Sequence, residues 1–430
     1  MDPTPSGSPT LPGANTSTSG STATGSAPAS PRGITRTTIS LGILTSNGYN
    51  GLASSAGLKG SSLGDQVAIA KSIVAYINSH GGIAGRKVVP VYYDINVGRY
   101  TSQESAEAAT ACAKFTQDSH VYAVAALVAW GNRDFYKCLA KHGVVAAAVE
   151  FSTRSMLRAL PETLYVPSDL NYTRGLADAV DALTSAGWFG AKPKVGAVGV
   201  DTPDSRDSIE NGLLPALRKH GISPATAPVY LRPGMDGSSG YSNGVLRMRT
   251  AHVDHVMFGQ GASLLLFAEQ AQSQGYYPRY MVDSRSSPGG TLQNTLPART
   301  LQGAMGLGWM PTLDNSEWSS IKTPGRSRCT KASKASGQDL TQAGTAVVAY
   351  WACDQIFFIQ DAVSRATTLT NPGFRAAAES LGSSFAPAAT FTSAFAVGRL
   401  HDGASSYRLN AFIDSCSCFK YVTGPRPLPQ

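Results

Sequence analysis

Apolar residues in the segment 65–79 recur at spacings of three and four, which marks one buried face of a helix. These apolar positions are Val67, Ala70, Ile73, Val74 and Ile77. Gly81 and Gly82 follow. Because glycine enters the left-handed conformation at no steric cost, the pair ends the helix. The pattern therefore predicts a helix from about Asp65 to Ser79.

Two segments rich in β-branched and aromatic residues flank this helix, and neither has a helical period. They are TTISLGIL at 37–44 and KVVPVYYDI at 87–95. A strand, a helix, a glycine turn and a second strand form a βαβ unit. Its strands should be parallel and its crossover right-handed.

The same alternation of strands and helices continues to residue 283. The expected strands are VYAVAALVA (121–129), VVAAAV (144–149), KVGAVGV (194–200), HVMFG (255–259) and RYMVD (279–283). Two further expected helices cover about 101–116 and 132–141. After residue 309 the pattern changes to long helices, notably about 339–366, and ends in short strands near 393–399, 405–412 and 417–422. We expect an α/β fold in which each lobe is a doubly wound parallel sheet flanked by helices.

Length and composition support two lobes. The chain has 430 residues, which exceeds the roughly 250–300 residues at which one hydrophobic core stops growing. Residues 1–33 hold one Leu and no Ile, Val or aromatic residue, which predicts a disordered Ser/Thr/Pro/Gly leader. The net charge is +8, but Lys and Arg are spread singly, so we expect no nucleic-acid partner. We find neither a signal-peptide pattern after Met1 nor an apolar stretch of transmembrane length.

The six cysteines favour an oxidising, extracytoplasmic compartment because their number is even; free thiols of a cytosolic core are the alternative. Cys112 and Cys138 lie on predicted helices that flank one strand, which predicts a disulfide between them. The other four are Cys329, Cys353, Cys416 and Cys418. Their pairing stays open, although we favour joining the first two, on adjacent predicted helices, and the last two. The CSC at 416–418 has no second pair or His nearby, so no metal site is expected.

The segment INSHGGIAGRKVVPVYYDIN at 77–96 also carries a resemblance. It is similar to the signature of type I periplasmic (extracellular) solute-binding proteins of the branched-chain amino acid (Leu/Ile/Val) ABC-transporter class. The matching residues are Asn78, Gly81, Gly82, Ile83, Gly85, Arg86 and Asp94. A weaker similarity covers residues 253–278, and the order of elements agrees from about residue 34 to the end.

The resemblance implies a two-lobed clamp that is hinged by three crossovers and closes on a small molecule. The expected boundaries are a leader over 1–33, lobe 1 over 34–166 and 301–392, and lobe 2 over 167–300 and 393–430. It also implies delivery of the bound molecule to a membrane permease of an ABC transporter. We expect a monomer that is exported and tethered to the outer face of the cell membrane through its leader, with lipidation as a hypothesis.

Candidate ligand-binding residues lie where the strands end, because open parallel sheets bind ligands beyond their carboxyl ends. They are Asn47, Tyr49, Trp130, Asn132, Ser152, Thr153, Tyr172, Asp201, Gln260, Asp283, Arg285 and Trp309. Tyr49 and Trp130 would stack on a ligand, or else cover the core. Asn132 and Ser152 or Thr153 fall near the position where the resemblance places groups that hold a ligand carboxylate; helix capping is the alternative.

The second lobe differs from the pattern of amino-acid-binding relatives. The resemblance implies an acidic side chain there that holds the ligand ammonium, but the matching stretch reads DSRSS at 283–287, with Arg285 close to Asp283. We therefore expect an aromatic or carboxylated ligand that stacks on Trp130 and Tyr49 and pairs with Arg285. A simple branched-chain amino acid is not expected. Trp309, just after an expected crossover, would line the cleft or the hinge.

Other classes of function have weaker support. GSSLG at 60–64 fits G-x-S-x-G, but a nucleophile elbow requires a strand before it and the preceding residues read as a loop. We find no H-E-x-x-H, G-x-G-x-x-G or phosphate-binding Gly-Lys-Ser/Thr motif, and we expect a surface or core role for His252 and His255. We therefore expect no catalytic residue, cofactor or metal. A ligand-sensing ectodomain of a signalling receptor is the alternative to a transport protein.

Overall fold

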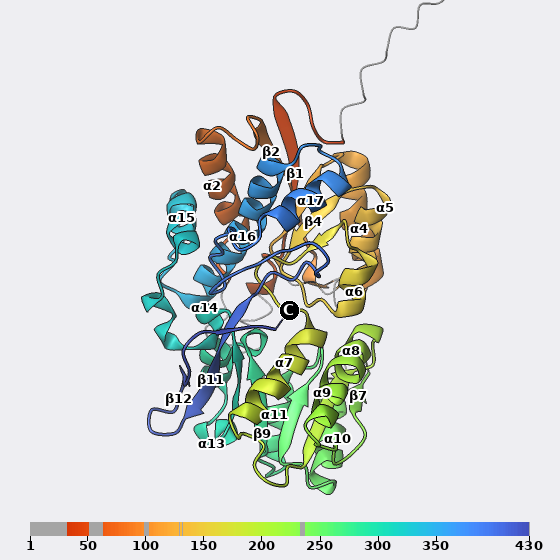
Figure 1. Cartoon of the computed structure of the whole chain (residues 1–430), viewed down its shortest axis with the longest axis vertical. Coiled ribbons are helices and arrows are strands. Elements are labelled where there is room, and N and C mark those ends of the chain that lie inside the picture. Colours follow the sequence, from red (N-terminus) through yellow and green to blue (C-terminus); the bar gives the residue numbers. More distant parts are fainter. Residues whose placement is uncertain are drawn as a thin grey trace, which may run out of the picture. The chain divides into compact units, whose positions relative to one another are not determined.

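The first sheet is parallel and has the strand order β2-β1-β3-β4-β5 in the described part of the chain. Figure 1 labels its strands β1, β2 and β4. The computed structural model describes residues 32–50, 63–98, 103–128, 130, 132–232 and 237–429. The strands are β1 Thr38–Thr45, β2 Lys87–Asp94, β3 Ala123–Ala126, β4 Val145–Ala148 and β5 Leu164–Tyr165. Strand β1 pairs with β2 along its whole length, so the predicted βαβ unit is confirmed. The expected leader lies outside the described residues except for Arg32 and Gly33.

Helices from two distant parts of the chain accompany this sheet. They are α2 Gln66–Ser79, α4 Glu104–Ala113, α5 Arg133–Lys141, α6 Arg154–Ala159, α15 Pro324–Ser333, α16 Ala343–Arg365 and α17 Asn371–Ser380. Helix α2 begins at the predicted place, where the Asp65 carboxylate accepts a hydrogen bond from the Ala68 amide. The predicted helices 101–116, 132–141 and 339–366 correspond to α4, α5 and α16.

The second sheet is mixed. Its strand order is β12-β11-β10-β9-β8-β6-β7, with β13 paired to β11. The strands are β6 Val195–Val200, β7 Val229–Leu231, β8 His255–Phe258, β9 Arg279–Asp283, β10 Met305–Gly308, β11 Ser406–Ile413, β12 Cys418–Tyr421 and β13 Arg426–Pro427. Strands β6 to β10 are parallel, as predicted, but β11 runs antiparallel to β10, β12 and β13. The sequence predicted short strands here without assigning their direction, and the short turn at 414–417 makes β11 and β12 antiparallel neighbours.

The helices of this half precede or follow its parallel strands. They are α7 Tyr172–Ser185, α8 Pro203–Ser208, α9 Leu214–Lys219, α10 Gly237–Thr250, α11 Leu264–Ser273, α12 Gln293–Thr295, α13 Ala298–Leu301 and α14 Pro311–Asp314. Short π-helical and 3-10 turns complete several of them. Each lobe therefore has the predicted α/β architecture.

The chain passes between the two sheets three times. The first passage follows β5, the second follows β10, and the third lies between α17 and β11. We expected residues 301–392 to belong to lobe 1, but β10 hydrogen-bonds to β9 and β11 of the second sheet. The second passage therefore begins about residue 309. The strand expected near 393–399 is reduced to one bridge, between Ser393 and Ala404.

The glycine-rich signature after α2 has a structural explanation. The Asn78 side chain donates to the Val88 carbonyl (3.0 Å) and accepts from the Val88 amide (2.7 Å), which ties the end of α2 to β2. Gly82 has φ +75°, and a Cβ there would lie 2.0 Å from the Arg86 carbonyl oxygen. Only glycine fits this position.

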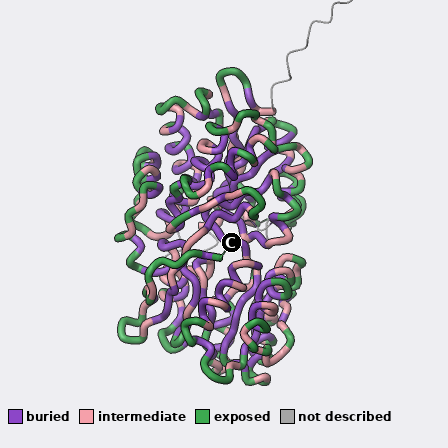
Figure 2. Tube along the Cα trace, viewed as in Figure 1, coloured by how far each residue is buried: buried purple, intermediate pink, exposed green. Residues whose placement is uncertain are grey.

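Alternating residues of the first sheet face two different cores. Ala123 and Ala125 of β3 pack with α2 and α16, whereas Val124 and Ala126 pack with α4 and α5. The second sheet likewise has a core on each face. Figure 2 shows the resulting buried interior, with exposed residues on the outer helices and turns.

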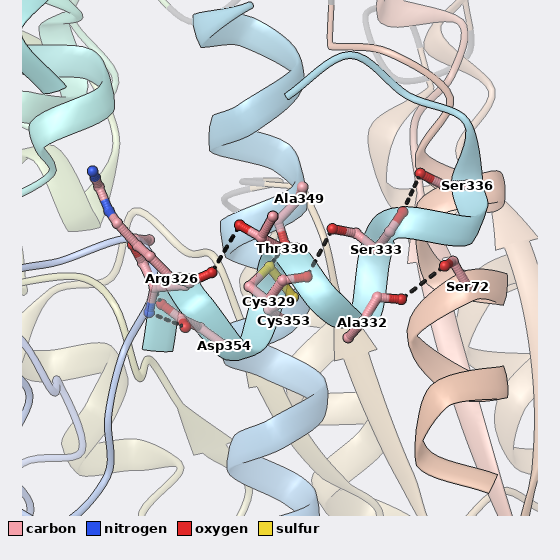
Figure 3. The surroundings of a disulfide bond; sticks show 12 residues. Ser72, Arg326, Cys329, Thr330, Ala332, Ser333, Ser336, Ala349, Cys353 and Asp354 are labelled. Atoms are coloured by element: carbon pink, nitrogen blue, oxygen red, sulfur yellow. Dashed lines mark hydrogen bonds between the residues drawn. A yellow bond between two sulfur atoms is a disulfide. The ribbon is translucent and has the colours of Figure 1, made fainter. Parts of the chain in front are cut away.

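All six cysteines form disulfides, in the pairing that the sequence favoured. Cys112–Cys138 joins α4 to α5, with 6.2 Å between the Cα atoms. Cys329–Cys353 joins α15 to α16 (Figure 3), and Cys416–Cys418 closes the turn before β12. The first two disulfides fix helix pairs on the first lobe.

Candidate functional site

A cavity of about 420 Å³ lies between loops that follow strands of both sheets. Its size falls within the range of small-molecule sites. Most of its wall is apolar or aromatic. The apolar and aromatic lining residues are Tyr49, Leu63, Phe151, Tyr172, Phe258, Ala262, Leu264, Leu265, Met281, Leu313, Ala343, Val347 and Trp351. Such a wall suits a ligand with a sizeable apolar body.

Two charged residues line this wall: Asp283, the last residue of β9, and Arg285, in the turn that follows. Asp283 ends β9 and its carboxylate accepts from the Ser286 amide (3.0 Å), which fixes the tight turn after the strand. This turn directs Arg285 back toward the lobe interface. The parallel sheet therefore places both charges at its carboxyl edge, as the sequence predicted for that edge.

The Arg285 guanidinium is held between two aromatic rings. It lies 3.6 Å from the centroid of the Tyr172 ring and 4.8 Å from that of Trp309. Its side chain is 4% exposed, and its Nε atom lies 3.5 Å from Asp283 Oδ2 and 3.8 Å from Asp169 Oδ1. Among the described residues, neither Nε nor Nη1 has a hydrogen-bond acceptor. A buried cation thus lines the cavity with part of its donor capacity unused.

Asp169 lies behind Arg285 in the first passage between the sheets. Its Oδ1 accepts from the Leu170 amide (2.7 Å) and from Trp309 Nε1 (3.1 Å). Burial raises the pKa of the Asp169 carboxyl to about 7, although Arg285 and these hydrogen bonds oppose the rise. Burial lowers the pKa of the Arg285 guanidinium, but the neighbouring Asp169 and Asp283 outweigh it and the net pKa is raised.

Comparison with known proteins identifies the family. Residues 51–403 match the sequence model of a family described as periplasmic binding protein, which is most of the chain. The chain belongs to the periplasmic binding protein family. No curated protein matches the sequence.

Solved structures of similar fold cover nearly the whole chain. A fatty acid ABC transporter substrate-binding protein from Thermomonospora curvata has a TM-score of 0.64 at 16% identity, covering 92% of this chain and 93% of its own. A possible leucine/isoleucine/valine-binding protein from Rhodopirellula baltica has a TM-score of 0.64 at 14% identity, covering 90% and 96%. The branched-chain amino acid transporter substrate binding protein LivJ from Streptococcus pneumoniae, in complex with isoleucine, has a TM-score of 0.58 at 14% identity, covering 91% and 99%.

At these identities the neighbours establish the fold. Together with the family match they confirm a type I periplasmic binding protein fold and a solute-binding role. This is a family of extracytoplasmic binding proteins. No helix within the described ranges is both long and apolar enough to span a bilayer.

Of the candidate ligand-binding residues in this periplasmic binding protein, the structure brings four to the cavity. They are Tyr49, Tyr172, Asp283 and Arg285. Burial raises the pKa of the Tyr49 and Tyr172 hydroxyls, so both remain neutral donors at physiological pH. Their contact with a ligand stays a prediction.

Three candidates of the first lobe have structural roles instead. Trp130 is buried in the core beside Phe135, with 5.1 Å between ring centroids. Asn132 caps α5 by accepting from the Phe135 amide, and Asn47 accepts from the Gln66 amide. Trp130 thus fits the alternative that the sequence left open, a ring that covers the core, and it does not line the described cavity.

Three further candidates lie at the junction of the lobes. The Thr153 hydroxyl donates to Asp204 Oδ1 (2.6 Å), and Gln260 Nε2 donates to the Phe151 carbonyl (3.4 Å). Ser152 is fully buried beside them. None of the three lines the described cavity.

Asp201 and Trp309 also lie outside the cavity wall. Asp201 is half exposed and pairs with Arg206 in its own lobe. Trp309 is fully buried and contacts Arg285 from behind, which agrees with a position at the hinge.

The sequence analysis missed the wall that α16 provides. Val347 and Trp351 of this helix face the cavity, but its nearly continuous apolar pattern indicated only a core helix. Asp169 was also missed, because nothing in its local sequence marks it as buried. Within the described residues no group of His, Cys, Asp or Glu could hold a metal ion. Residues 60–62 of the G-x-S-x-G string lie outside the described residues.

Proposed function

We propose that this protein captures a small carboxylated molecule with an apolar or aromatic body and delivers it to an ABC-type permease. Family membership and the lobe-spanning cavity support capture of a solute. Similar structures of proteins that are named as ABC transporter substrate-binding proteins support the transport role. The protein would act by binding and not by catalysis, as a monomer tethered outside the membrane through a lipidated leader.

The observation that carries the ligand chemistry is the state of Arg285. Its Nε and Nη1 donors are buried at the cavity without an acceptor among the described residues. An unused donor of a buried cation costs free energy, which a ligand acceptor would recover. A carboxylate suits this site because one of its oxygens could accept from Nη1, and a charge-assisted hydrogen bond to a guanidinium is stronger than one to a neutral acceptor.

The remaining wall restricts the rest of the ligand. Leu264, Leu265, Leu313 and Val347 offer apolar contacts, and Trp351 offers an aromatic face. The Asp283 carboxylate already neighbours Arg285 and accepts from the Ser286 amide. It is therefore poorly placed to hold a ligand ammonium alone, so leucine, isoleucine and valine should bind weakly.

A matched set of probes tests this proposal. 3-Phenylpropionate, 3-phenylpropanamide and 3-phenylpropylamine share one apolar body and differ in carrying a carboxylate, an amide or an ammonium. We expect the rise in melting temperature on binding to decrease in that order, because binding to the folded state alone stabilises it. Micromolar binding of leucine, isoleucine or valine in calorimetry would contradict the proposal.

Arg285→Gln provides the residue-level test. Loss of a charge-assisted hydrogen bond should weaken 3-phenylpropionate by roughly 10- to 100-fold, which corresponds to about 1.5–3 kcal/mol. The amide should lose less. Arg206→Gln, which removes an exposed arginine outside the cavity wall, is the matched control and should leave both affinities unchanged.

A further inference from the structure

The loop after β4 and the first two residues of α6 are joined residue by residue to the second lobe. The Phe151 carbonyl accepts from Gln260 Nε2, and the Ser152 carbonyl accepts from the Tyr172 amide (2.8 Å). The bonds of residues 153–155 to the second lobe are Thr153 Oγ1 to Asp204 Oδ1, the Arg154 amide to Thr173 Oγ1, and the Ser155 amide to Asp207 Oδ2. Five consecutive residues of lobe 1 thus contact lobe 2.

These bonds fall into two groups. Tyr172 and Thr173 open α7 directly after the first passage between the lobes, where hinge motion displaces atoms least. Asp204 and Asp207 lie on α8, which follows the first strand of the second sheet. Figure 1 shows α6 and α8 facing each other across the junction of the lobes. Gln260, which follows β8, also lies away from the hinge, so opening would break its bond to Phe151 together with the bonds to α8.

Asp204 has the strongest bonds in this second group. Its Oδ1 accepts from the Thr153 hydroxyl and from Arg133 Nη2, which also forms an ion pair with it. The Asp204 and Arg133 side chains are 15% and 26% exposed, so water screens this pair only in part. Arg133 also donates to the Ser155 hydroxyl (2.9 Å), which holds the guanidinium in place.

The contact lies beside the ligand cavity and not in it. The cavity is lined by Phe151 and Tyr172, which take part in the first of these bonds between the lobes. It is not lined by Arg133, Thr153 or Asp204. A change at Asp204 therefore leaves the cavity wall intact while it acts on the relative position of the lobes.

We propose that Asp204 is a positioning residue that latches the two lobes closed through Arg133 and Thr153. In the closed protein its carboxylate accepts from both donors, and on opening all three groups become hydrated. The latch contributes to closure whichever ligand is bound, and it gives a reason why Thr153 is not a ligand-binding residue here.

Spin-label distances in the ligand-free full chain test the latch. Labels at Lys141→Cys on α5 and Arg218→Cys on α9 report the separation of the lobes, and both native side chains are exposed. The native cysteines are all in disulfides, so they do not react with the label. We expect the parent protein to have a short-distance population. Asp204→Ala should add a longer-distance population and lower the ratio of closed to open molecules roughly 10-fold, which corresponds to about 1.4 kcal/mol.

Two further variants separate the latch from a general loss of structure. Asp201→Asn lies three residues away and loses only its pair with Arg206 within lobe 2, so its distances should match those of the parent. The charge exchange Arg133→Asp with Asp204→Arg should restore the short distance. Identical distributions for the parent and Asp204→Ala would overturn the proposal, as would a parent that shows only the long distance. Because no ligand is used, failure of the proposed ligand class does not affect the result.

Discussion

Binding of a carboxylate at Arg285 should depend on pH through Asp169. This carboxyl lies behind the guanidinium, 3.8 Å from its Nε, and burial raises its pKa to about 7. The charged or titratable groups around it are Arg285, Asp283 and Tyr172. A second negative charge brought to Arg285 disfavours the ionised form of Asp169, so the bound state should have a higher Asp169 pKa than the free state.

The sign and size of the effect follow from that shift. Because the bound state holds its proton more tightly, binding takes up a proton and affinity rises as the pH falls. At an effective dielectric constant of about 20, two negative charges about 5 Å apart repel by roughly 3 kcal/mol, or about two pH units. With a free pKa near 7, the neutral fraction of Asp169 decreases from about nine-tenths at pH 6 to about one-tenth at pH 8. The affinity for 3-phenylpropionate should therefore be about 10-fold weaker at pH 8.

Isothermal titration calorimetry at pH 6, 7 and 8, in buffers of different ionisation enthalpy, measures both the affinity and the number of protons taken up. Asp169→Asn should abolish the pH dependence. Asp178→Asn is the matched control, because burial also raises the pKa of Asp178 to about 7 but this residue does not line the cavity. The affinity of this variant should still decrease from pH 6 to pH 8. An affinity that is constant or rises from pH 6 to pH 8 would refute the assignment of a carboxylate to Arg285.

Two more predictions concern the first lobe. Replacing Cys112 and Cys138 together by Ser should lower the free energy of unfolding by about 3 kcal/mol, because the disulfide closes a loop of 26 residues; denaturant unfolding measures this, and finding both thiols free in a non-reduced digest would contradict the bond. Trp130→Ala should lower the free energy of unfolding by about 3–5 kcal/mol. Its affinity for 3-phenylpropionate should not change at a temperature where the variant is folded. Trp351→Ala should weaken the binding of 3-phenylpropionate with a smaller loss of stability. Calorimetry and thermal unfolding of both variants separate these roles, and the reverse pattern would contradict the placement of the two rings.

Local sequence patterns predicted the position of a helix or strand wherever that position depends only on residues of the same segment. The three-and-four spacing of apolar residues located α2, and the following glycines located its end, because these effects act over a few residues. The antiparallel course of β11 and the position of β10 in the second sheet were not accessible in this way. Both depend on which lobe a strand joins, and a short apolar strand looks the same in either sheet.

The candidate site was only partly accessible for the same reason. Strand ends led to Asp283 and Arg285, which line the cavity, because parallel topology alone brings strand ends together. Residue type misdirected the choice of Trp130, since an aromatic residue near a strand end can equally fill the core. Thr153 was chosen as an anion-binding hydroxyl, and it does bind a carboxylate, but that carboxylate is Asp204 of the same chain.

The position of Asp169 connects the ligand site to the hinge. Asp169 belongs to the first passage between the lobes, and Trp309, which donates to its carboxylate, begins the second. The Ala404 amide of the third passage donates to the Asp169 carbonyl (3.1 Å). A negative charge bound at Arg285 therefore acts on a residue that is hydrogen-bonded to the other two connections between the lobes. Protonation of Asp169 would remove a buried charge from this junction, so the free energy of carboxylate binding and the electrostatics of the hinge should be coupled through one side chain.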